Sequence, residues 1–437
     1  MSELIDASAK ALAMAIRDKK VSSEEVIDAH LRRIEAINPK INAVVQLTAD
    51  VARQQARKAD DLVASGDVRG PLHGVPFTVK DWIETAGVVC AADYEERAEF
   101  VPKRDATVVA RMRDAGAIML GKTNVQESNP VYGETYNPYD LSRTPGYSSS
   151  GEAAIIAAGG SPVGLGSDSG GSIRLPVHCC GIAGLKPSAG LVPNTGHFPR
   201  IGAMSDPRTQ IGPLARFVED LALTLPVISG VDWLDAGVIP MPLGDPNAVE
   251  IKGLRVAFYT DDEGASPTPE TIAVVKAARV VLADAGAVVN EARPQRLEEA
   301  REITLAYWRR PSSSLSWRSW MPDRVGEMTG DEVERSLFEW DRFRRAMLSF
   351  MESYDLILTP ASNRPADPHG TRDAFDTVYT LPYSLTGYPC VVVRAGTSAK
   401  GLPIGVQVVA RPWRDDVALA VAQHIETALG GWKRPPI

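Results

Sequence analysis

The chain has 437 residues, of which 44% are hydrophobic and 23% are charged, so it can bury a large core and lacks the bias of a disordered polymer. Its 47 basic and 55 acidic residues give a net charge of −8, which provides no positive field for a phosphate backbone. We therefore expect a globular protein without a nucleic-acid partner.

Cysteine usage and hydropathy bear on location and on metal binding. Cys90, Cys179, Cys180 and Cys390 match neither the paired CxxC spacing of a zinc site nor a dense disulfide framework. The N-terminal residues place apolar and charged side chains at helical spacing, and no segment is an apolar run long enough to span a bilayer. We expect reduced thiols, a cytoplasmic protein, no membrane contact and no bound metal.

The first segment, about 1–66, is predicted to be helical. Its apolar positions recur three and four apart, and Ser22 with Glu25 forms a capping-box pattern. Over about 70–230, the short apolar runs VPFTV, AIML and VGLG alternate with helical stretches such as 107–115. This alternation predicts an α/β core.

The second half of the chain repeats the alternation. The runs LRVAFY, DLILT, CVVV and IGVQVV have the composition of buried strands, and helices are predicted at about 268–285 and 415–429. We expect one sheet to take strands from both halves. Between them, residues 300–350 are rich in Trp and Arg, and we expect a helix there that acts as a cap or pocket wall.

Two Gly/Ser clusters, 146–151 and 166–172, lie between apolar runs that must be buried. Glycine permits conformations that turn backbone N–H groups inward, so either cluster can form an oxyanion hole. Ser148 and Ser172 are therefore the candidate nucleophiles. A flexible linker has a similar composition, but the buried segments around these clusters argue against it.

A serine nucleophile needs a base, and histidine is the usual one. Only His178 and His197 lie near the clusters, and the apolar surroundings of His178 (VHCCG) favour a buried structural role. A desolvated lysine is the alternative. Lys80 directly follows the apolar run HGVPFTV, where a buried charge without a function is unfavourable. A strand-end lysine that simply reaches solvent is the competing interpretation.

The motifs GVPFTVKD, GKTN, NPY, SSSGE, GSDSGGSIRLP and GIAGLKP follow one another between His73 and Pro187. In this order they resemble the amidase signature family, which includes fatty acid amide hydrolase and the A subunit of glutamyl-tRNA amidotransferase. A weaker resemblance, with IGPLAR and PIGVQVVA, covers most of the remaining chain. It implies one domain, 1–437, built on a single large mixed β-sheet with α-helices on both faces.

The resemblance also implies catalytic roles. Lys80 falls on the family's base, Ser148 on its relay serine and Ser172 on its acyl-forming serine. Asp168 and Arg174 fall where the family holds a structural ion pair. The oxyanion hole falls on the backbone N–H groups of four successive residues: Ser169, Gly170, Gly171 and Ser172.

The function implied is amidohydrolysis without a cofactor. Lys80 takes a proton from Ser148, Ser148 takes one from Ser172, and Ser172 attacks the carbonyl carbon of the substrate. We expect a small-molecule amide, anilide or carbamate as substrate, with esters and urethanase activity open because they share the same carbonyl chemistry. A homodimer is also left open.

The chain departs from the family pattern beside the relay serine. Tyr147 and Ser150 replace glycines that many members have there, and the stretch between GKTN and SNPVYG is shortened. Trp82, Tyr132, Tyr147 and Ile173 are predicted to contact the substrate. Aromatic side chains that could line an apolar or aryl pocket also include Tyr136, Trp308 and Trp317.

Two other functions compete with this one. Residues 116–123 (GAIMLGKT) satisfy the phosphate-binding GxxxxGK[ST] pattern, but AIML is typical of a buried strand and Pro130 follows where a helix is needed. A glutamine-hydrolysing A subunit of a tRNA-dependent amidotransferase remains the alternative, although the C-terminal region lacks the stretch expected of one. A non-catalytic binding protein is disfavoured because all three catalytic positions are present.

Overall fold

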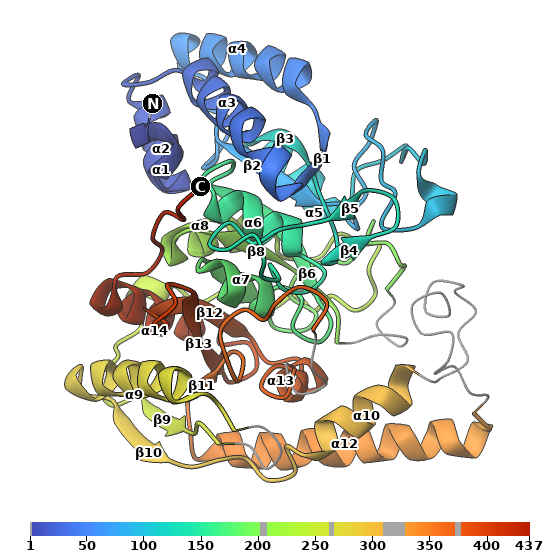
Figure 1. Cartoon of the computed structure of the whole chain (residues 1–437), viewed down its shortest axis with the longest axis vertical. Helices are drawn as coiled ribbons and strands as arrows, with labels where there is room; N and C mark the ends of the chain where they lie inside the picture. The colour runs from blue at the N-terminus through green and yellow to red at the C-terminus, as the bar shows by residue number, and fades with distance from the viewer. Residues whose placement is uncertain (1, 202–207, 262–265, 309–327, 372–376) are drawn as a thin grey trace.

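The computed structural model describes residues 2–201, 208–261, 266–308, 328–371 and 377–437, without the side chains of Ser2 and Trp308. These residues form an 11-stranded sheet, in the order β1-β3-β2-β6-β8-β7-β12-β13-β11-β9-β10 (Figure 1). Its strands are β1 (Val44–Leu47), β2 (Pro76–Lys80), β3 (Ile118–Thr123), β6 (Val163–Asp168), β7 (Ala183–Lys186), β8 (Gln210–Ala215), β9 (Arg255–Phe258), β10 (Val288–Glu291), β11 (Leu356–Pro360), β12 (Cys390–Thr397) and β13 (Pro403–Ala410). Two further strands, β4 (Ser128–Asn129) and β5 (Gly133–Glu134), pair with each other.

The large sheet is mixed and joins both halves of the sequence. Strands β3, β2 and β6 are parallel to one another, as are β11, β9 and β10, and all other neighbouring strands of the sheet pair antiparallel. The halves meet where β7 pairs with β12. Continuous apolar runs form these strands because both faces of the sheet are covered.

Helices cover both faces of the sheet. Along β3, Met119 packs in one core cluster with α5, α8, α9 and α14, whereas Ile118 and Leu120 pack in another with α3, α4, α6 and α7. The predicted sheet with helices on both faces is therefore confirmed. The helices are α1 (Ser2–Asp6), α2 (Ala9–Arg17), α3 (Ser23–Ile41), α4 (Ala49–Ser65), α5 (Thr107–Asp114), α6 (Ser150–Ala157), α7 (Arg174–Cys180), α8 (Val218–Ile228), α9 (Pro269–Asp284), α10 (Glu299–Trp308), α12 (Gly330–Glu352), α13 (Leu381–Thr386) and α14 (Asp415–Leu429), with short 3₁₀ helices η1 (Glu95–Arg97) and η2 (Pro246–Ala248).

The N-terminal segment is helical as predicted, except for strand β1. The capping box of Ser22 and Glu25 is present at the start of α3. That helix ends at Ile41, and the left-handed conformation of its capping residue Asn42 (φ 47°) redirects the chain into β1, which pairs antiparallel with β3. A strand of four residues between two long helices carries too short a pattern to be recognised in the sequence.

The region predicted as a cap contains α10 and α12. Tyr307 of α10 packs edge-on against Trp340 of α12, with ring centroids 5.6 Å apart, and both lie in a third core cluster with α13 and β11. Residues 309–327, including Trp317, lie outside the described part of the chain. The position of these helices is visible in Figure 1, beside the β9–β10 end of the sheet.

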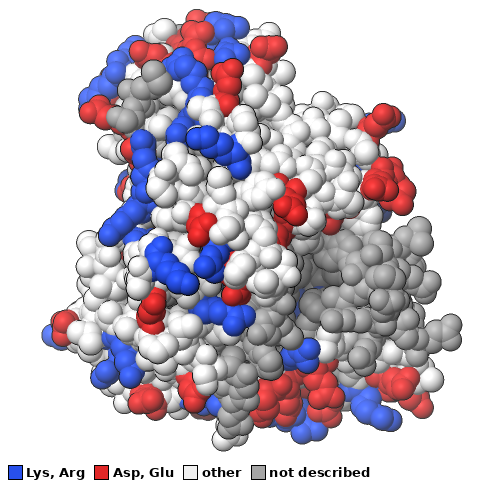
Figure 2. Space-filling model, viewed as in Figure 1, with Lys and Arg blue, Asp and Glu red and all other residues white. Residues whose placement is uncertain are grey.

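Charge on the molecular surface is mixed. Figure 2 shows basic and acidic side chains interspersed over the visible face, without one continuous basic surface among the residues described there. None of the helices within the described ranges is both long enough and apolar enough to cross a bilayer.

The buried carboxylate of Asp220 on α8 holds the start of α2, because the backbone N–H groups of Ala9 and Lys10 both donate to it at 2.9 Å. Asp220→Ala leaves these donors unpaired and should lower the free energy of unfolding by about 1–3 kcal/mol, measured by urea denaturation. Among the described residues, the neighbouring Glu219 forms a surface ion pair with Lys10 and no other ion pair, so Glu219→Ala should change the free energy of unfolding by less than about 1 kcal/mol. Equal losses in the two variants would contradict this account.

Candidate active site

Lys80 is the last residue of β2, and its side chain is fully buried. Its Nζ lies 2.6 Å from Ser148 Oγ, 3.1 Å from Ser167 Oγ and 3.4 Å from the carbonyl oxygen of Ser167. Strands β2 and β6 run parallel, so their carboxyl ends reach the same edge of the sheet and bring Lys80 beside Ser167. The lysine therefore contacts hydroxyl and carbonyl groups instead of ending in solvent.

Burial lowers the pKa of Lys80 well below its usual value, because desolvation disfavours the ammonium form. The nearby carboxylates act in the opposite direction; they belong to Asp168, Asp93 and Glu152. The Trp82 ring, whose centroid is 4.1 Å from Nζ, also favours the cation, by about 0.5–2 kcal/mol. The direction set by burial prevails, which makes a neutral amine accessible.

Ser148 lies just before α6 and is 3% exposed. Gly146 approaches the backbone of α7 so closely that a Cβ there would lie 2.6 Å from the Cα of Pro176, and its φ of +108° also requires glycine. Tyr147, which follows it, is half-buried and belongs to none of the core clusters of the described chain. The glycine thus sets the path of the chain into Ser148.

Ser172 lies in the tight loop between β6 and α7. Gly171 has a φ of +136°, and a Cβ there would lie 2.7 Å from Thr380 Oγ1, so glycine is needed at this position. The carboxylate of Asp168 accepts from the backbone N–H groups of Gly171 at 2.8 Å and of Ile173 at 3.1 Å. The loop that carries Ser172 is therefore fastened on both sides of the serine.

The predicted ion pair of Asp168 and Arg174 is present and fully buried. Arg174 donates from Nε and Nη2 to the two carboxylate oxygens, each at 2.9 Å. Burial alone would raise the pKa of Asp168, but attraction to Arg174 and the hydrogen bonds outweigh it and lower the pKa to about 2. The carboxylate therefore stays ionised and continues to accept the hydrogen bonds from the loop backbone.

Two of the residues predicted to contact the substrate lie beside catalytic candidates: Trp82 beside Lys80, and Ile173 in the loop that carries Ser172. Trp82 packs on Lys80 and donates from Nε1 to Asp93 at 2.8 Å. Ile173 follows Ser172, but its side chain is fully buried in the core with Val177 of α7.

Tyr132 lies on the turn between β4 and β5. Its hydroxyl accepts a hydrogen bond from Gln46 Nε2 of β1 at 3.2 Å, so the ring is held at the edge of the sheet.

His178 is buried in α7, where Nδ1 accepts from the Gly405 N–H at 3.0 Å and Nε2 donates to the Arg364 carbonyl at 2.9 Å. This confirms the structural environment predicted for His178.

Of residues 116–123, the last six form the buried strand β3 (Ile118–Thr123), so the segment is not a phosphate-binding loop. The chain continues into β4, and Lys122 is buried with its Nζ 3.8 Å from Asp81 Oδ1. This confirms the strand expected at AIML. No group of three or more His, Cys, Asp or Glu side chains within the described ranges is arranged to hold a metal ion.

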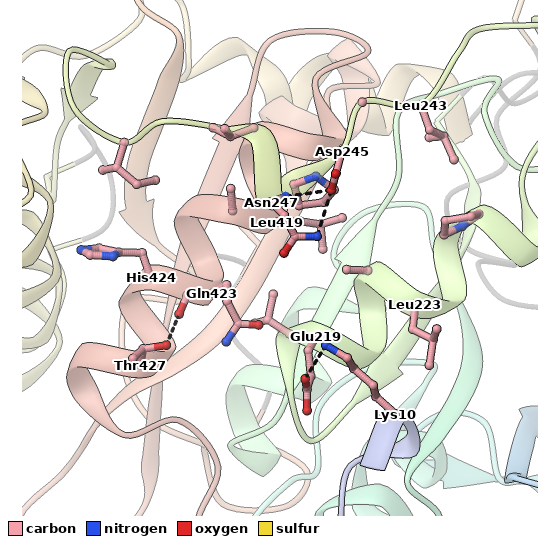
Figure 3. A pocket seen from close by; sticks show the side chains of 18 residues that line it. Lys10, Glu219, Leu223, Leu243, Asp245, Asn247, Leu419, Gln423, His424 and Thr427 are labelled. Atoms are coloured by element: carbon pink, nitrogen blue, oxygen red, sulfur yellow. Dashed lines mark hydrogen bonds and ion pairs between the residues drawn. The ribbon is translucent and has the colours of Figure 1, made fainter. Parts of the chain in front are cut away.

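A separate groove of about 700 Å³ lies between α8, η2 and α14, and Figure 3 shows its lining. Lys10 and Glu219 form an ion pair of 3.3 Å there, and Asp245 accepts from the backbone of Asn247 at 2.9 Å. The lining residues do not include Lys80, Ser148 or Ser172. The groove is therefore distinct from the serine–lysine site.

Sequence reasoning missed Ser167 and gave no role to His197. Ser167 Oγ lies between Lys80 Nζ and the Nε2 of His197, which is 2.8 Å away. The only signal was the presence of a further hydroxyl in the GSDSGG segment and of a histidine downstream. Their meeting depends on the path of the loop that follows β7.

The comparisons with known proteins agree with this architecture. The family model described as Amidase matches residues 25–419. The A subunit of the glutamyl-tRNA(Gln) amidotransferase of Moorella thermoacetica is 33% identical, with 99% of each chain covered, and an acylamidase of Rhodococcus erythropolis is 32% identical, covering 98% of this chain and 97% of its own. The structure of 6-aminohexanoate cyclic dimer hydrolase complexed with substrate superposes with a TM-score of 0.87 at 29% identity, with 99% of each chain covered. A family match over most of the chain, together with this likeness in sequence and fold, shows that the chain belongs to the amidase signature family, whose members include amide-hydrolysing enzymes.

Proposed function

We propose that this protein is an amidohydrolase that cleaves the C–N bond of a small-molecule amide, anilide or carbamate through an acyl-Ser172 intermediate. The observation that carries the proposal is the buried Lys80 amine, 2.6 Å from the Ser148 hydroxyl and without a carboxylate in ion-pair contact among the described residues. An amine in that setting can act as a base toward a hydroxyl group.

The proposed reaction begins with neutral Lys80. It accepts the Ser148 proton while Ser148 accepts the Ser172 proton, and Ser172 Oγ attacks the carbonyl carbon of the substrate. The same protons then return along the relay to the leaving nitrogen, which is a poor leaving group as an anion. Water hydrolyses the resulting ester of Ser172.

The oxyanion in this proposal is held by backbone N–H groups of residues 169–172. The N–H of Gly171 already donates to Asp168, so we assign the main role to those of Gly170 and Ser172. The buried ion pair of Asp168 and Arg174 supports this assignment because it holds the loop in one conformation before substrate binds.

The substrate class is supported by the surroundings of the loop. The Ser169 hydroxyl pairs with Thr209, and the neighbouring Arg208 lies 4.0 Å from the ring centroid of Tyr307 on α10. These contacts link the loop to α10 through residues 208 and 209, which supports our proposal that α10 forms a pocket wall. Relatives named as an acylamidase and as a 6-aminohexanoate cyclic dimer hydrolase favour non-peptide amides. Activity on carbamates and esters, a cytoplasmic location and a homodimer stay predictions.

A glutamine-hydrolysing role within an amidotransferase is the second candidate, and its support is the 33% identity over nearly the whole length of the Moorella relative. Glutaminase activity together with co-purification of partner proteins would favour it. Turnover of aryl or aliphatic amides by the isolated chain, with none on glutamine, would favour the first proposal.

Ser172→Ala should abolish turnover and labelling by a fluorophosphonate, because both require the same nucleophile. Ser150→Ala is the matched control: Ser150 is a neighbouring buried serine whose hydroxyl donates to the Gln126 carbonyl. It should keep the label and most of the turnover. Labelling that survives in Ser172→Ala, detected by mass spectrometry, would place the nucleophile elsewhere.

The pH dependence should report the deprotonation of Lys80. Since only the neutral amine is active and burial lowers its pKa, kcat/KM should rise with pH and reach its plateau below about pH 10.4, the usual lysine value. The rising limb belongs to the coupled Lys80–Ser148–Ser172 unit. A rate that is flat from about pH 6 to 10, with chemistry limiting, would count against a lysine base.

Tyr147 is expected to set substrate choice, because it replaces a glycine beside Ser148 and is half-buried. Tyr147→Gly should change the relative kcat/KM for bulky aryl and small aliphatic amides by about 1–3 kcal/mol, the usual range for shape discrimination in an apolar pocket. An equal loss on every substrate would show that the substitution only disturbs the Ser148 loop.

A further inference from the structure

Lys80 has a second chain of hydrogen bonds, which leads away from Ser148. Its Nζ lies 3.1 Å from Ser167 Oγ, which lies 2.8 Å from His197 Nε2, and the His197 Nδ1 lies 2.9 Å from the Pro199 carbonyl oxygen. Both His197 and Ser167 are buried, at 4% and 1% exposure. The amine and the imidazole are thus linked through one hydroxyl, shielded from bulk water.

The direction of these bonds follows from the acceptor at the far end. A carbonyl oxygen can only accept, so Nδ1 of His197 carries a proton. Nε2 of the neutral ring is then a lone pair, to which the Ser167 hydroxyl donates. The oxygen of Ser167 in turn accepts from Lys80. The chain therefore runs from Lys80 through Ser167 to His197.

The imidazole is fixed against the segment that carries the lysine. Its ring packs edge-on against Trp82, with centroids 5.8 Å apart, while Trp82 also lies under the Lys80 amine. The Phe198 N–H donates to the Trp82 carbonyl at 2.7 Å, and Ile83 forms a β-bridge with His197. These contacts hold Nε2 toward Ser167.

We propose that Ser167 and His197 form a second proton path that helps to keep Lys80 neutral. The Lys80 ammonium gives a proton to Ser167 Oγ while the original Ser167 proton moves to His197 Nε2. One N–H and one O–H bond break as one O–H and one N–H bond form, which leaves a neutral amine and an imidazolium. Because the two residues act through Lys80, they are positioning residues; the proposal rests on the base role of Lys80 in the proposed function.

The charged groups around this path influence whether Lys80 is protonated. Three carboxylates act on Lys80 and favour its ammonium form: Asp168, Asp93 and Glu152. Next to His197 in the sequence, the Phe198 ring contacts Arg97, which pairs with Glu84 at 3.2 Å. Below the pH at which Lys80 titrates alone, a proton shared with His197 leaves part of the lysine neutral. Without the path, the proton stays on the lysine.

The test compares kcat/KM and the rate of fluorophosphonate labelling from about pH 6 to 10 in the wild type, Ser167→Ala and His197→Gln. Both variants should lose activity most strongly at low pH and approach the wild type at high pH, with about a tenfold loss for each unit by which the rising limb moves. The double variant should be no worse than Ser167→Ala. Ser167→Thr, which keeps the hydroxyl, should retain the wild-type profile.

A loss equal at every pH, or an unchanged profile, would overturn the proposal and leave Ser167 and His197 with a packing role. Thermal unfolding of each variant separates this outcome from misfolding. The tautomer is tested without any substrate, by ¹⁵N NMR of the imidazole: the proposal requires a proton on Nδ1 of neutral His197, and a proton on Nε2 instead would refute it. If the wild type neither hydrolyses amides nor reacts with the fluorophosphonate, the proposed function is wrong. The NMR measurement would still show whether the proton path has the required tautomer.

Discussion

The architecture around the site depends on one constraint, a lysine amine held in the interior at the end of a central strand. An isolated ammonium in such a position is strongly disfavoured, and removal of its proton relieves most of that penalty. The hydrogen-bond partners of the Lys80 amine are hydroxyl and carbonyl oxygens from β6 and from the turn before α6. A carboxylate at contact distance would have stabilised the ammonium, raised the pKa of the amine and left little of it neutral to act as a base. The neutral character of these contacts is thus as important as the burial.

The three carboxylates near the lysine all have other hydrogen-bond partners, and that of Asp93 accepts from Trp82 Nε1. Asp168 is bound to Arg174 and to the nucleophile loop, and Glu152 accepts hydrogen bonds from the hydroxyls of Thr78 and Thr123. Burial raises the pKa of Glu152 to about 7, so part of its population is neutral near neutral pH and its attraction for the lysine is weakened. The scaffold therefore holds acidic groups close to the base without letting them bind it.

Much of the fold was predictable because long apolar runs and helical periodicity repeat along the chain. For example, the helix predicted at about 415–429 is observed as α14, Asp415–Leu429. The cluster of Lys80 with Ser148 was predictable from motifs that follow one another in sequence. Strand β1 was not, because four residues carry little pattern. The environment of His197 was also not predictable from the sequence. Its hydrogen bond to Ser167 joins residues 30 positions apart, through a loop that folds over Trp82. Sequence patterns report local geometry, whereas such contacts depend on tertiary packing.

The hydrogen bonds of Arg174 to residues far downstream have a consequence for folding during synthesis. Its guanidinium donates to the Thr380 carbonyl at 2.8 Å, to Ser384 Oγ at 2.6 Å and to Gln407 Oε1 at 3.0 Å, partners contributed by α13 with its preceding residue and by β13. During synthesis α7 emerges before α13 and β13, so the guanidinium lacks these partners until residues 380–407 have also left the ribosome. The support of the nucleophile loop is thus completed by residues 206 to 233 positions further along the chain, and a fragment ending before β13 leaves Arg174 without its Gln407 contact.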